Sequence, residues 1–338
     1  MILGILAILA IVLSLPRGRH DSGASPSSGF RVGLVFDVGG RGDKSFNDAA
    51  YIGLLRAERE LGVATELVEP GGPEDREAAL RLFAARRFDL VIGVGFIFSR
   101  DIDRVAKDYP AVRFACVDYA PAFGPDGPLP MPPNVTALAF RENEGAFLVG
   151  AAAGLLTHSK HVGFVGGMDI PLIHKFDAGY RAGVAAVCPE CEVHGAYAGS
   201  TPDAFRDPAK GKSIALAQIG LGADVLFHAA GSTGHGMFEA AKDASVLAIG
   251  VDADQADEAP GTVVTSMIKR GDVAVFDAIK AAKEGRLEGG MLAVGLAEGG
   301  VDWVHDGPHA SGISAEIRGR VELLRAKVVA GEIVVPEK

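Results

Sequence analysis

The sequence lacks an excess of basic residues. Its 338 residues include 33 Lys and Arg against 43 Asp and Glu, which gives a formal net charge of −10. Polyanions repel a protein of this charge, so binding to nucleic acid polymers or to anionic lipid surfaces is disfavoured. Apolar residues make up 48% of the chain. The chain can therefore bury a large core, and its length suits two ordinary domains.

The sequence also lacks the motifs of common enzyme classes. Gly211-Lys212-Ser213 resembles the end of a phosphate-binding loop, but Arg206 stands where that motif needs its first glycine. Gly93-Val94-Gly95 begins a dinucleotide fingerprint whose third glycine is replaced by Phe98. Neither a Gly-x-Ser-x-Gly elbow nor a His-Glu-x-x-His pair occurs in the sequence. We therefore expect a protein that is not an enzyme.

Metal-ligating side chains are sparse. The nine histidines, among them His158, His161 and His174, show no metal-binding spacing and are expected as surface or capping residues. Cys116 lies in an apolar run and is expected to be buried. Cys188-Pro189-Glu190-Cys191 has zinc-ligand spacing without a second pair to complete a site, so these thiols are either a local disulfide or idle. We expect no metal and no cofactor.

The long apolar run lies at the start of the chain. Residues 1–15 are nearly all apolar, and Arg17, Arg19 and a Ser/Gly/Pro-rich stretch follow them. This run is short for a membrane span and typical of a signal-peptide core, although the arginines also suit a signal anchor. We assign residues 1–29 to a signal peptide or anchor with its linker, and expect export to the periplasm or cell envelope. No cysteine follows the run, so a lipid anchor is not supported.

Short β-branched segments alternate with amphipathic ones along the rest of the chain. Strands are predicted at 32–36, 90–94, 112–117, 162–165, 225–229, 246–251 and 263–267. Helices are predicted at 49–61, 75–86, 101–108, 144–156, 175–187, 209–221, 237–244 and 273–284. Apolar strands separated by helices indicate parallel sheets covered on both faces, so the expected fold class is α/β with right-handed βαβ units.

A proline-rich stretch at 121–133 divides this alternation into two halves. We predict two Rossmann-like lobes with parallel sheets, joined by a hinge. The first lobe is assigned residues 31–138 plus 254–290 and the second 139–252 plus 291–338, with crossings near Asp252 and Gly289. A ligand would then bind between the lobes, at the carboxyl ends of the strands.

A polar, glycine-rich loop at residues 37–48 connects the first predicted strand to the first helix. Such a loop is where open α/β sheets bind ligands. Phe46 offers an aromatic face and Asn47 a group that both donates and accepts hydrogen bonds, which suits a flat heterocycle. Phe176, at the start of a later helix, is either a core residue or a second aromatic that faces Phe46 across the cleft.

Polar and small residues end several of the predicted strands. Asp37, Asp118 and Asp252 follow the first, third and sixth strands, and Gly231 follows the fifth. Each aspartate alone is also typical of a helix cap or turn. Together, at one edge of two sheets, they favour a shared pocket. Lys269 is either a solvated residue at a helix start or a donor to a ligand oxygen.

Several motifs resemble the basic membrane protein family of ABC-transporter substrate-binding proteins, whose members include purine nucleoside receptors. The resemblance covers residues 31–305 and is carried by the motifs Asp37-Val-Gly-Gly, Asp43-Lys-Ser-Phe-Asn47, Gly163-Phe-Val-Gly-Gly-Met-Asp-Ile-Pro171, Phe176-Asp-Ala-Gly-Tyr-Arg-Ala-Gly183, Asp207-Pro-Ala-Lys-Gly-Lys212, His228-Ala-Ala-Gly-Ser-Thr-Gly234, Ile249-Gly-Val-Asp252 and Thr265-Ser-Met-Ile-Lys-Arg270. It implies a type I periplasmic binding protein fold, with two lobes and a hinge.

The resemblance also implies roles for residues that would contact a base. In nucleoside-binding relatives, two phenylalanines sandwich the base, and here these positions are Phe46 and Phe176. Asn47 and Asp118 are expected to contact the base edge.

A second group is implied to hold the sugar. Asp252, with Gly231 and Lys269, is expected to clamp the ribose. Asp37 is expected to support the first loop or to touch the ligand, and Ser45 of the same loop completes the expected ligand-binding set.

The resemblance predicts a non-enzymatic receptor for purine nucleosides (inosine, guanosine or adenosine) that works with an ABC permease in the membrane. We expect a monomer that binds no nucleic acid polymer. The alternative is an extracytoplasmic sensor or signalling module of the same fold with a different small ligand. A nucleoside hydrolase ranks last, because the calcium-binding aspartate cluster of such enzymes is not seen in the sequence.

Overall fold

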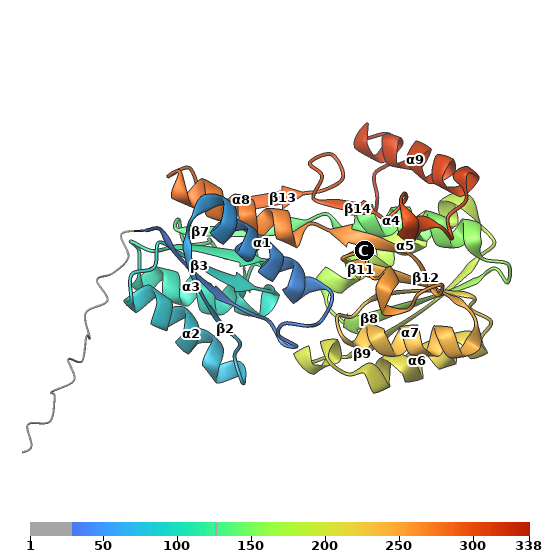
Figure 1. Ribbon diagram of the computed structural model, residues 1–338, viewed down its shortest axis with the longest axis horizontal. Helices are drawn as coiled ribbons and strands as arrows, with labels where there is room; N and C mark the ends of the chain where they lie inside the picture. Colours follow the sequence, from blue (N-terminus) through green and yellow to red (C-terminus); the bar gives the residue numbers. More distant parts are fainter. Residues whose placement is uncertain (1–28, 126) are drawn as a thin grey trace, which may run out of the picture.

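The computed structural model describes residues 29–125 and 127–338, which form two α/β lobes lying side by side (Figure 1). The first lobe holds a six-stranded parallel sheet with the order β13-β7-β4-β3-β1-β2. Its strands are β1 (Arg31–Val35), β2 (Ala64–Val68), β3 (Leu90–Val94), β4 (Arg113–Val117), β7 (Val135–Phe140) and β13 (Gly290–Val294).

Helices cover both faces of this sheet because its central strands are apolar on both sides. All five residues of β3, for example, are buried. The helices α1 (Phe46–Leu61) and α8 (Gly271–Lys283) pack together on one face, and α2 (Pro73–Ala85) and α3 (Ser99–Asp108) pack together on the other. A 3₁₀ turn, Phe96–Phe98, follows β3 at the carboxyl edge of the sheet.

The second lobe repeats this plan. Its sheet has the order β14-β12-β11-β10-β8-β9 and is parallel except for β14. The strands are β8 (His161–Met168), β9 (Glu192–Gly199), β10 (Val225–Ala229), β11 (Leu247–Asp252), β12 (Val263–Lys269) and β14 (Val301–Trp303). A 3₁₀ turn, Pro202–Phe205, follows β9, and two more lie at Ala256–Glu258 and Pro308–Ala310. The two sheets confirm the expected α/β fold of two lobes.

The second sheet is also covered on both faces. The helices α4 (Glu142–Leu156) and α5 (Pro171–Val187) lie on one face, α6 (Pro208–Gly220) and α7 (Thr233–Ala244) on the other, and α9 (Ala315–Val329) packs on α4. Glycines let α4 and α5 approach closely. A Cβ atom at Gly150 would lie 2.2 Å from the Tyr180 carbonyl oxygen, and one at Gly183 would lie 2.0 Å from that of Phe147.

The chain passes between the lobes at three places: after β7, after β12, and between β13 and β14. The crossing segments are joined by backbone hydrogen bonds from Arg141 N–H to the Val294 carbonyl and from Arg270 N–H to the Gly300 carbonyl, both 2.9 Å long. Three crossings bound in this way form the hinge of the molecule.

One crossing differs from the sequence expectation, which placed residues 254–290 in the first lobe. Strand β12 instead pairs in parallel with β11, so residues 263–269 extend the second sheet and the chain crosses after Lys269 rather than near Asp252. The following helix α8 packs on α1 in the first lobe, as expected. Likewise, β13 pairs with β7 in the first sheet, and the last crossing follows Val294 rather than Gly289.

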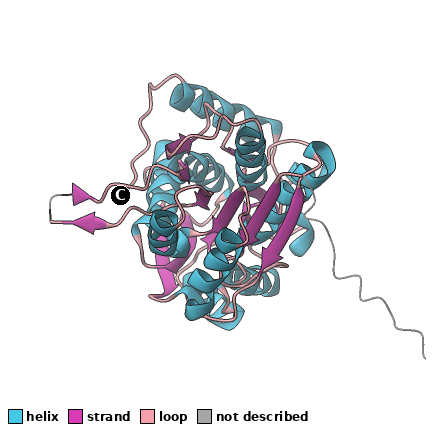
Figure 2. Ribbon diagram, turned by 90° about the vertical axis from the view of Figure 1, so that its left-hand side faces the viewer, coloured by secondary structure: helices cyan, strands magenta, loops and turns pink. Residues whose placement is uncertain are grey.

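Three further observations concern the periphery. A short hairpin, β5 (Phe123–Gly124) with β6 (Gly127–Pro128), projects from the body where the proline-rich break was predicted (Figure 2). Cys188 and Cys191 form the disulfide that was one of two alternatives, and Cys116 is buried and free as expected. The expected signal or anchor segment lies outside the described residues, and no helix within the described part is long and apolar enough to cross a membrane.

Candidate ligand-binding site

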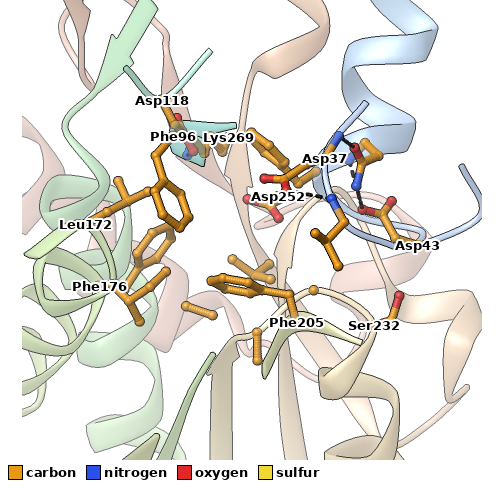
Figure 3. Close-up of a pocket in the computed structure, with 18 residues that line it drawn as sticks. Asp37, Asp43, Phe96, Asp118, Leu172, Phe176, Phe205, Ser232, Asp252 and Lys269 are labelled. Atoms are coloured by element: carbon orange, nitrogen blue, oxygen red, sulfur yellow. Dashed lines mark hydrogen bonds and ion pairs between the residues drawn. The ribbon is translucent and has the colours of Figure 1, made fainter. Parts of the chain in front are cut away.

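A cavity lies between the lobes, at the carboxyl ends of strands from both sheets (Figure 3). Eighteen residues line it, and it contains about 610 Å³ of space free of protein atoms, part of it open to solvent. The cavity therefore lies where the fold predicts a ligand.

The first loop is organised by Asp43, whose carboxylate caps the start of α1. It accepts hydrogen bonds from the backbone N–H groups of Ser45 (3.0 Å), Asn47 (2.9 Å) and Asp48 (3.1 Å). The Asn47 side chain continues this network: its NH₂ donates to Asp43 at 3.0 Å and its oxygen accepts from Asp37 N–H at 3.0 Å. Asn47 lines the cavity, but its amide already fixes the loop.

Asp37 enters the cavity beside a glycine that makes room for it. A Cβ atom at Gly95 would lie 2.0 Å from Asp37 Oδ2, and Gly95 has a φ of +106°. The other oxygen, Oδ1, accepts from Val38 N–H at 2.5 Å. Burial, together with the nearby carboxylate of Asp118, raises the pKa of Asp37 to about 7. Asp37 therefore titrates close to neutral pH.

The strand-end aspartates Asp118 and Asp252 both have left-handed backbone conformations, with φ of +60° and +66°. Non-glycine residues adopt this region rarely, and such strain is often concentrated at functional sites. Both side chains are buried and line the cavity. Asp118 Oδ1 has no hydrogen-bond partner among the described residues. That oxygen is available to accept a hydrogen bond from a ligand.

Lys269 lies at the centre of a buried charge cluster. Its ammonium is 2.6 Å from Asp118 Oδ2 and 3.1 Å from Glu142 Oε1, and the Lys269 side chain is 3% exposed. Burial opposes the charged form, but Asp118, Glu142 and Asp252 together raise the pKa of Lys269 above its usual value. The lysine is therefore a permanent cation held by carboxylates.

Aromatic rings from both lobes border the cavity. The Lys269 ammonium lies 5.2 Å from the centroid of the Phe46 ring and 5.7 Å from that of the Phe176 ring. These rings come from α1 in the first lobe and α5 in the second, and they share the space around the lysine. Two further rings, Phe96 and Phe205, meet edge to face with centroids 6.4 Å apart (Figure 3).

The sequence analysis did not predict Phe96 and Phe205. Phe96 directly follows Gly95 after β3, and Phe205 ends the 3₁₀ turn after β9. The strand-end rule that pointed to the aspartates applies to Phe96 as well. No comparable signal marks Phe205, because β9 itself was not predicted.

The structure brings eight of the nine expected site residues to the cavity wall. They are Asp37, Phe46, Asn47, Asp118, Phe176, Gly231, Asp252 and Lys269. Gly231 has a φ of +53° at the turn after β10. Ser45 differs, since it is fully buried, is not among the lining residues, and donates its hydroxyl to Asp252.

Contacts across the cleft hold the lobes together around the cavity. Besides the bonds from Ser45 to Asp252 and from Lys269 to Asp118, the Gln255 amide donates to the Lys44 carbonyl at 3.0 Å. Each contact joins a residue of the first lobe to one of the second. The structure is therefore a closed form of the two-lobed molecule.

Solved structures share this architecture. A solute-binding protein of an ABC transporter system from Aeropyrum pernix K1 aligns with a TM-score of 0.81 at 33% identity, over 91% of this chain and 94% of that one. A second such protein, from Conexibacter woesei, aligns with a TM-score of 0.71 at 25% identity, over 91% and 98%. This chain therefore shares the two-lobed type I fold of solute-binding proteins of ABC transporters.

Sequence relatives give the family. The profile described as "ABC transporter substrate-binding protein PnrA-like" (Bmp) matches residues 30–338. Relatives include the ABC transporter nucleoside-binding protein BmpA of Lactococcus lactis (31% identity, 99% of each chain) and the CD4+ T-cell-stimulating antigen of Listeria monocytogenes (35%, covering 92% of this chain and 89% of that one). The chain belongs to the Bmp family of substrate-binding proteins and is not an enzyme.

The family also bears on where the protein works. Substrate-binding proteins of this family bind their ligands outside the cytoplasm, which agrees with the expected export. A relative from Pyrococcus horikoshii, 36% identical over 89% of this chain and 77% of its own, is named a lipoprotein. Lipid attachment therefore occurs among the relatives, whereas no cysteine follows the apolar run of this sequence.

Proposed function

We propose that this protein binds purine nucleosides in the interlobe cavity, as a monomer, and delivers them to an ABC permease for uptake. The observation that carries the proposal is the pair of phenyl rings, Phe46 and Phe176, which reach one cavity from opposite lobes beside three strand-end carboxylates. The name of the Lactococcus lactis relative, a nucleoside-binding protein, supports the same ligand class.

The aromatic rings suit a planar base. An aromatic side chain that stacks on a base contributes about 1–3 kcal/mol. Phe46 and Phe176 supply one face from each lobe, so a base between them would be gripped only when the lobes close. Phe96 and Phe205 add apolar surface to the same cavity. Closure around a stacked base would therefore report occupancy to the permease.

The polar groups suit a neutral ligand that is rich in hydrogen-bond donors. Asp37, Asp118 and Asp252 are acceptors when ionised, and the free Oδ1 of Asp118 would accept from a base N–H or a sugar hydroxyl. Lys269 is already paired with two carboxylates. A phosphate group would meet several negative charges without an unpaired cation, so the site should reject nucleotides.

Calorimetry with inosine, guanosine and adenosine tests the ligand class, with inosine 5′-monophosphate as the charged control. We expect at least one nucleoside to bind with a Kd well below 100 μM and the monophosphate to bind at least tenfold more weakly. A Kd of 100 μM corresponds to about −5.5 kcal/mol. If no nucleoside reaches that affinity, the proposal is lost.

A matched pair of variants tests the site. Phe46→Ala should weaken nucleoside binding by about 1–3 kcal/mol, the contribution of one stacked ring. Phe123→Ala is the control, because this phenylalanine is 73% exposed on the projecting hairpin, away from the cavity wall. Equal affinities in both variants and the wild type would remove Phe46 from the ligand site. A single species of about 35 kDa in analytical ultracentrifugation would support the monomer.

A further inference from the structure

We propose that His161, Glu192 and His194 form a site for a divalent transition-metal ion such as Zn²⁺, separate from the ligand cavity. The three residues lie at the amino ends of β8 and β9, two strands that run side by side in the second lobe (Figure 1). The cavity lies at the opposite, carboxyl ends. β8 has eight residues, so the cluster is roughly 23 Å from the carboxyl end of that strand.

Strand register places the three side chains on one face of the sheet. His161 is opposite Glu192, and Gly163 is opposite His194, in a parallel pair. Side chains two residues apart in a strand point to the same side. The sequence spacing alone gave no metal motif, because one ligand comes from β8 and two come from β9, with 30 residues of chain between them.

The donor atoms are close enough to share one ion. One ligand atom from each residue lies within 4.8 Å of the other two. His161 Nδ1 is 3.1 Å from His194 Nε2 and 3.7 Å from Glu192 Oε2. Ligands at about 2.1 Å from a tetrahedral zinc ion are about 3.4 Å from one another, so the two separations bracket the required value.

The side chains can adjust to complete the site. The imidazole rings are stacked, with an interplanar angle of 14°, so an ion requires a rotation about χ2, which is a soft torsion in histidine. The Glu192 side chain is 66% exposed and free to move. Two imidazoles and one carboxylate leave a fourth position for water, which is the ligand count of an open zinc site.

The surrounding charges favour a cation. Lys160, which directly precedes His161 in the sequence, is paired with Glu190 at 3.3 Å, and Glu192 adds a negative charge. The disulfide between Cys188 and Cys191 fixes the turn that leads directly into Glu192. An ion here would tie β9, the edge strand of the second sheet, to β8. It would act as a structural staple on this edge, in addition to the backbone pairing with β8 and the hydrogen bond from Tyr197 to Asp177.

Calorimetry with Zn²⁺ on untagged, chelator-treated full-length protein tests the site, because a polyhistidine tag would bind the probe. We expect one Zn²⁺ per chain with a Kd below 100 μM, and at least tenfold weaker binding in both Glu192→Gln and His194→Ala. The control is His158→Ala, which removes an exposed histidine outside the cluster and should leave the affinity unchanged.

Two further measurements make the outcome decisive. Co²⁺ bound in place of Zn²⁺ should give visible absorption bands of a tetrahedral ion, which the Glu192→Gln variant should lose. The same variant should bind inosine as tightly as the wild type does, because the cluster is far from the cavity. Absence of Zn²⁺ binding below 100 μM, or equal affinities in the wild type and in both cluster variants, would overturn the proposal.

Discussion

Replacing Lys269 with Met is the sharpest test of the buried charge cluster. Met has a similar length and no charge, so the substitution removes the cation without leaving a large void. Asp118 and Glu142 would then remain buried, without the ammonium that now lies 2.6 Å and 3.1 Å from them. Breaking a buried ion pair by removing one partner costs about 3–5 kcal/mol, because the other charge is left uncompensated.

The loss of unfolding free energy in Lys269→Met should depend on pH, and the structure predicts the direction of this dependence. Burial already raises the pKa of Asp118 to about 6 in the presence of the lysine. Without the lysine, its folded-state pKa rises further above the unfolded value, so the folded variant takes up protons as the pH falls. The destabilisation should therefore be largest near pH 8 and smaller at pH 5, where Asp118 is increasingly protonated.

Urea unfolding at pH 8 and pH 5 measures the free energy of unfolding of both proteins. The transition is monitored by circular dichroism and by the fluorescence of Trp303, the single tryptophan. Coincident transitions justify a two-state analysis. Lys175→Met is the matched control, because its side chain is 26% exposed and lies 3.4 Å from Glu142, so it should cost at most about 1 kcal/mol. A loss below about 1 kcal/mol for Lys269→Met at pH 8, or a loss that does not shrink at pH 5, would refute the reasoning.

Three further predictions follow from single contacts. Burial raises the pKa of Asp37 from 3.8 to about 7, so its contribution to stability is complete below about pH 4 and is lost as the pH rises through 7. In urea unfolding, the wild type should therefore lose stability relative to Asp37→Asn between pH 5 and pH 8. Parallel plots of stability against pH for the two proteins would contradict this prediction. Ser45→Ala removes the hydroxyl that donates to Asp252 across the cleft, and should lower the free energy of unfolding by about 1–3 kcal/mol. An unchanged midpoint of urea unfolding would mean that this hydrogen bond contributes nothing to stability. Replacing Cys188 and Cys191 by Ser opens a four-residue loop and should cost about 2 kcal/mol, measured against the wild type with and without reductant.

In the described part of the chain, seven of the eight interior strands of the two large sheets could be predicted from the sequence, whereas the interior strand β7 and the edge strands were missed. All seven predicted strands are present, because each is an apolar run in the middle of a sheet. The strands β2 and β9 lie at sheet edges and contain no fully buried residue, so their sequences carry no continuous apolar run. The crossing after β12 was misplaced for a related reason. The apolar sequence of a strand predicts that the strand is buried, but it does not predict to which of two similar sheets the strand belongs.

The polar residues of the cavity could be located because parallel strands end at the same sheet edge. That rule places Asp37, Asp118 and Asp252 together without knowledge of any contact. It does not assign what each group does. Asn47 was expected to contact a ligand, yet its amide bonds to Asp37 and Asp43 within the loop. Topology predicts that a side chain lies at the carboxyl edge of the sheet. Its hydrogen-bond partners depend on interatomic distances, which a sequence pattern does not give.

Gly95 shows that a glycine motif predicts close approach to the backbone but does not identify the group that approaches. As part of Gly93-Val94-Gly95 it resembles the start of a dinucleotide fingerprint, in which glycine lets the backbone approach a phosphate. In this protein, the missing side chain makes room for the Asp37 carboxylate, which lies where a Cβ atom would point. A phosphate and a carboxylate both require close approach, so the same glycine serves either chemistry. The neighbouring strand end distinguishes the two cases, because an ionised aspartate there disfavours a phosphate, in agreement with the neutral ligand that we propose.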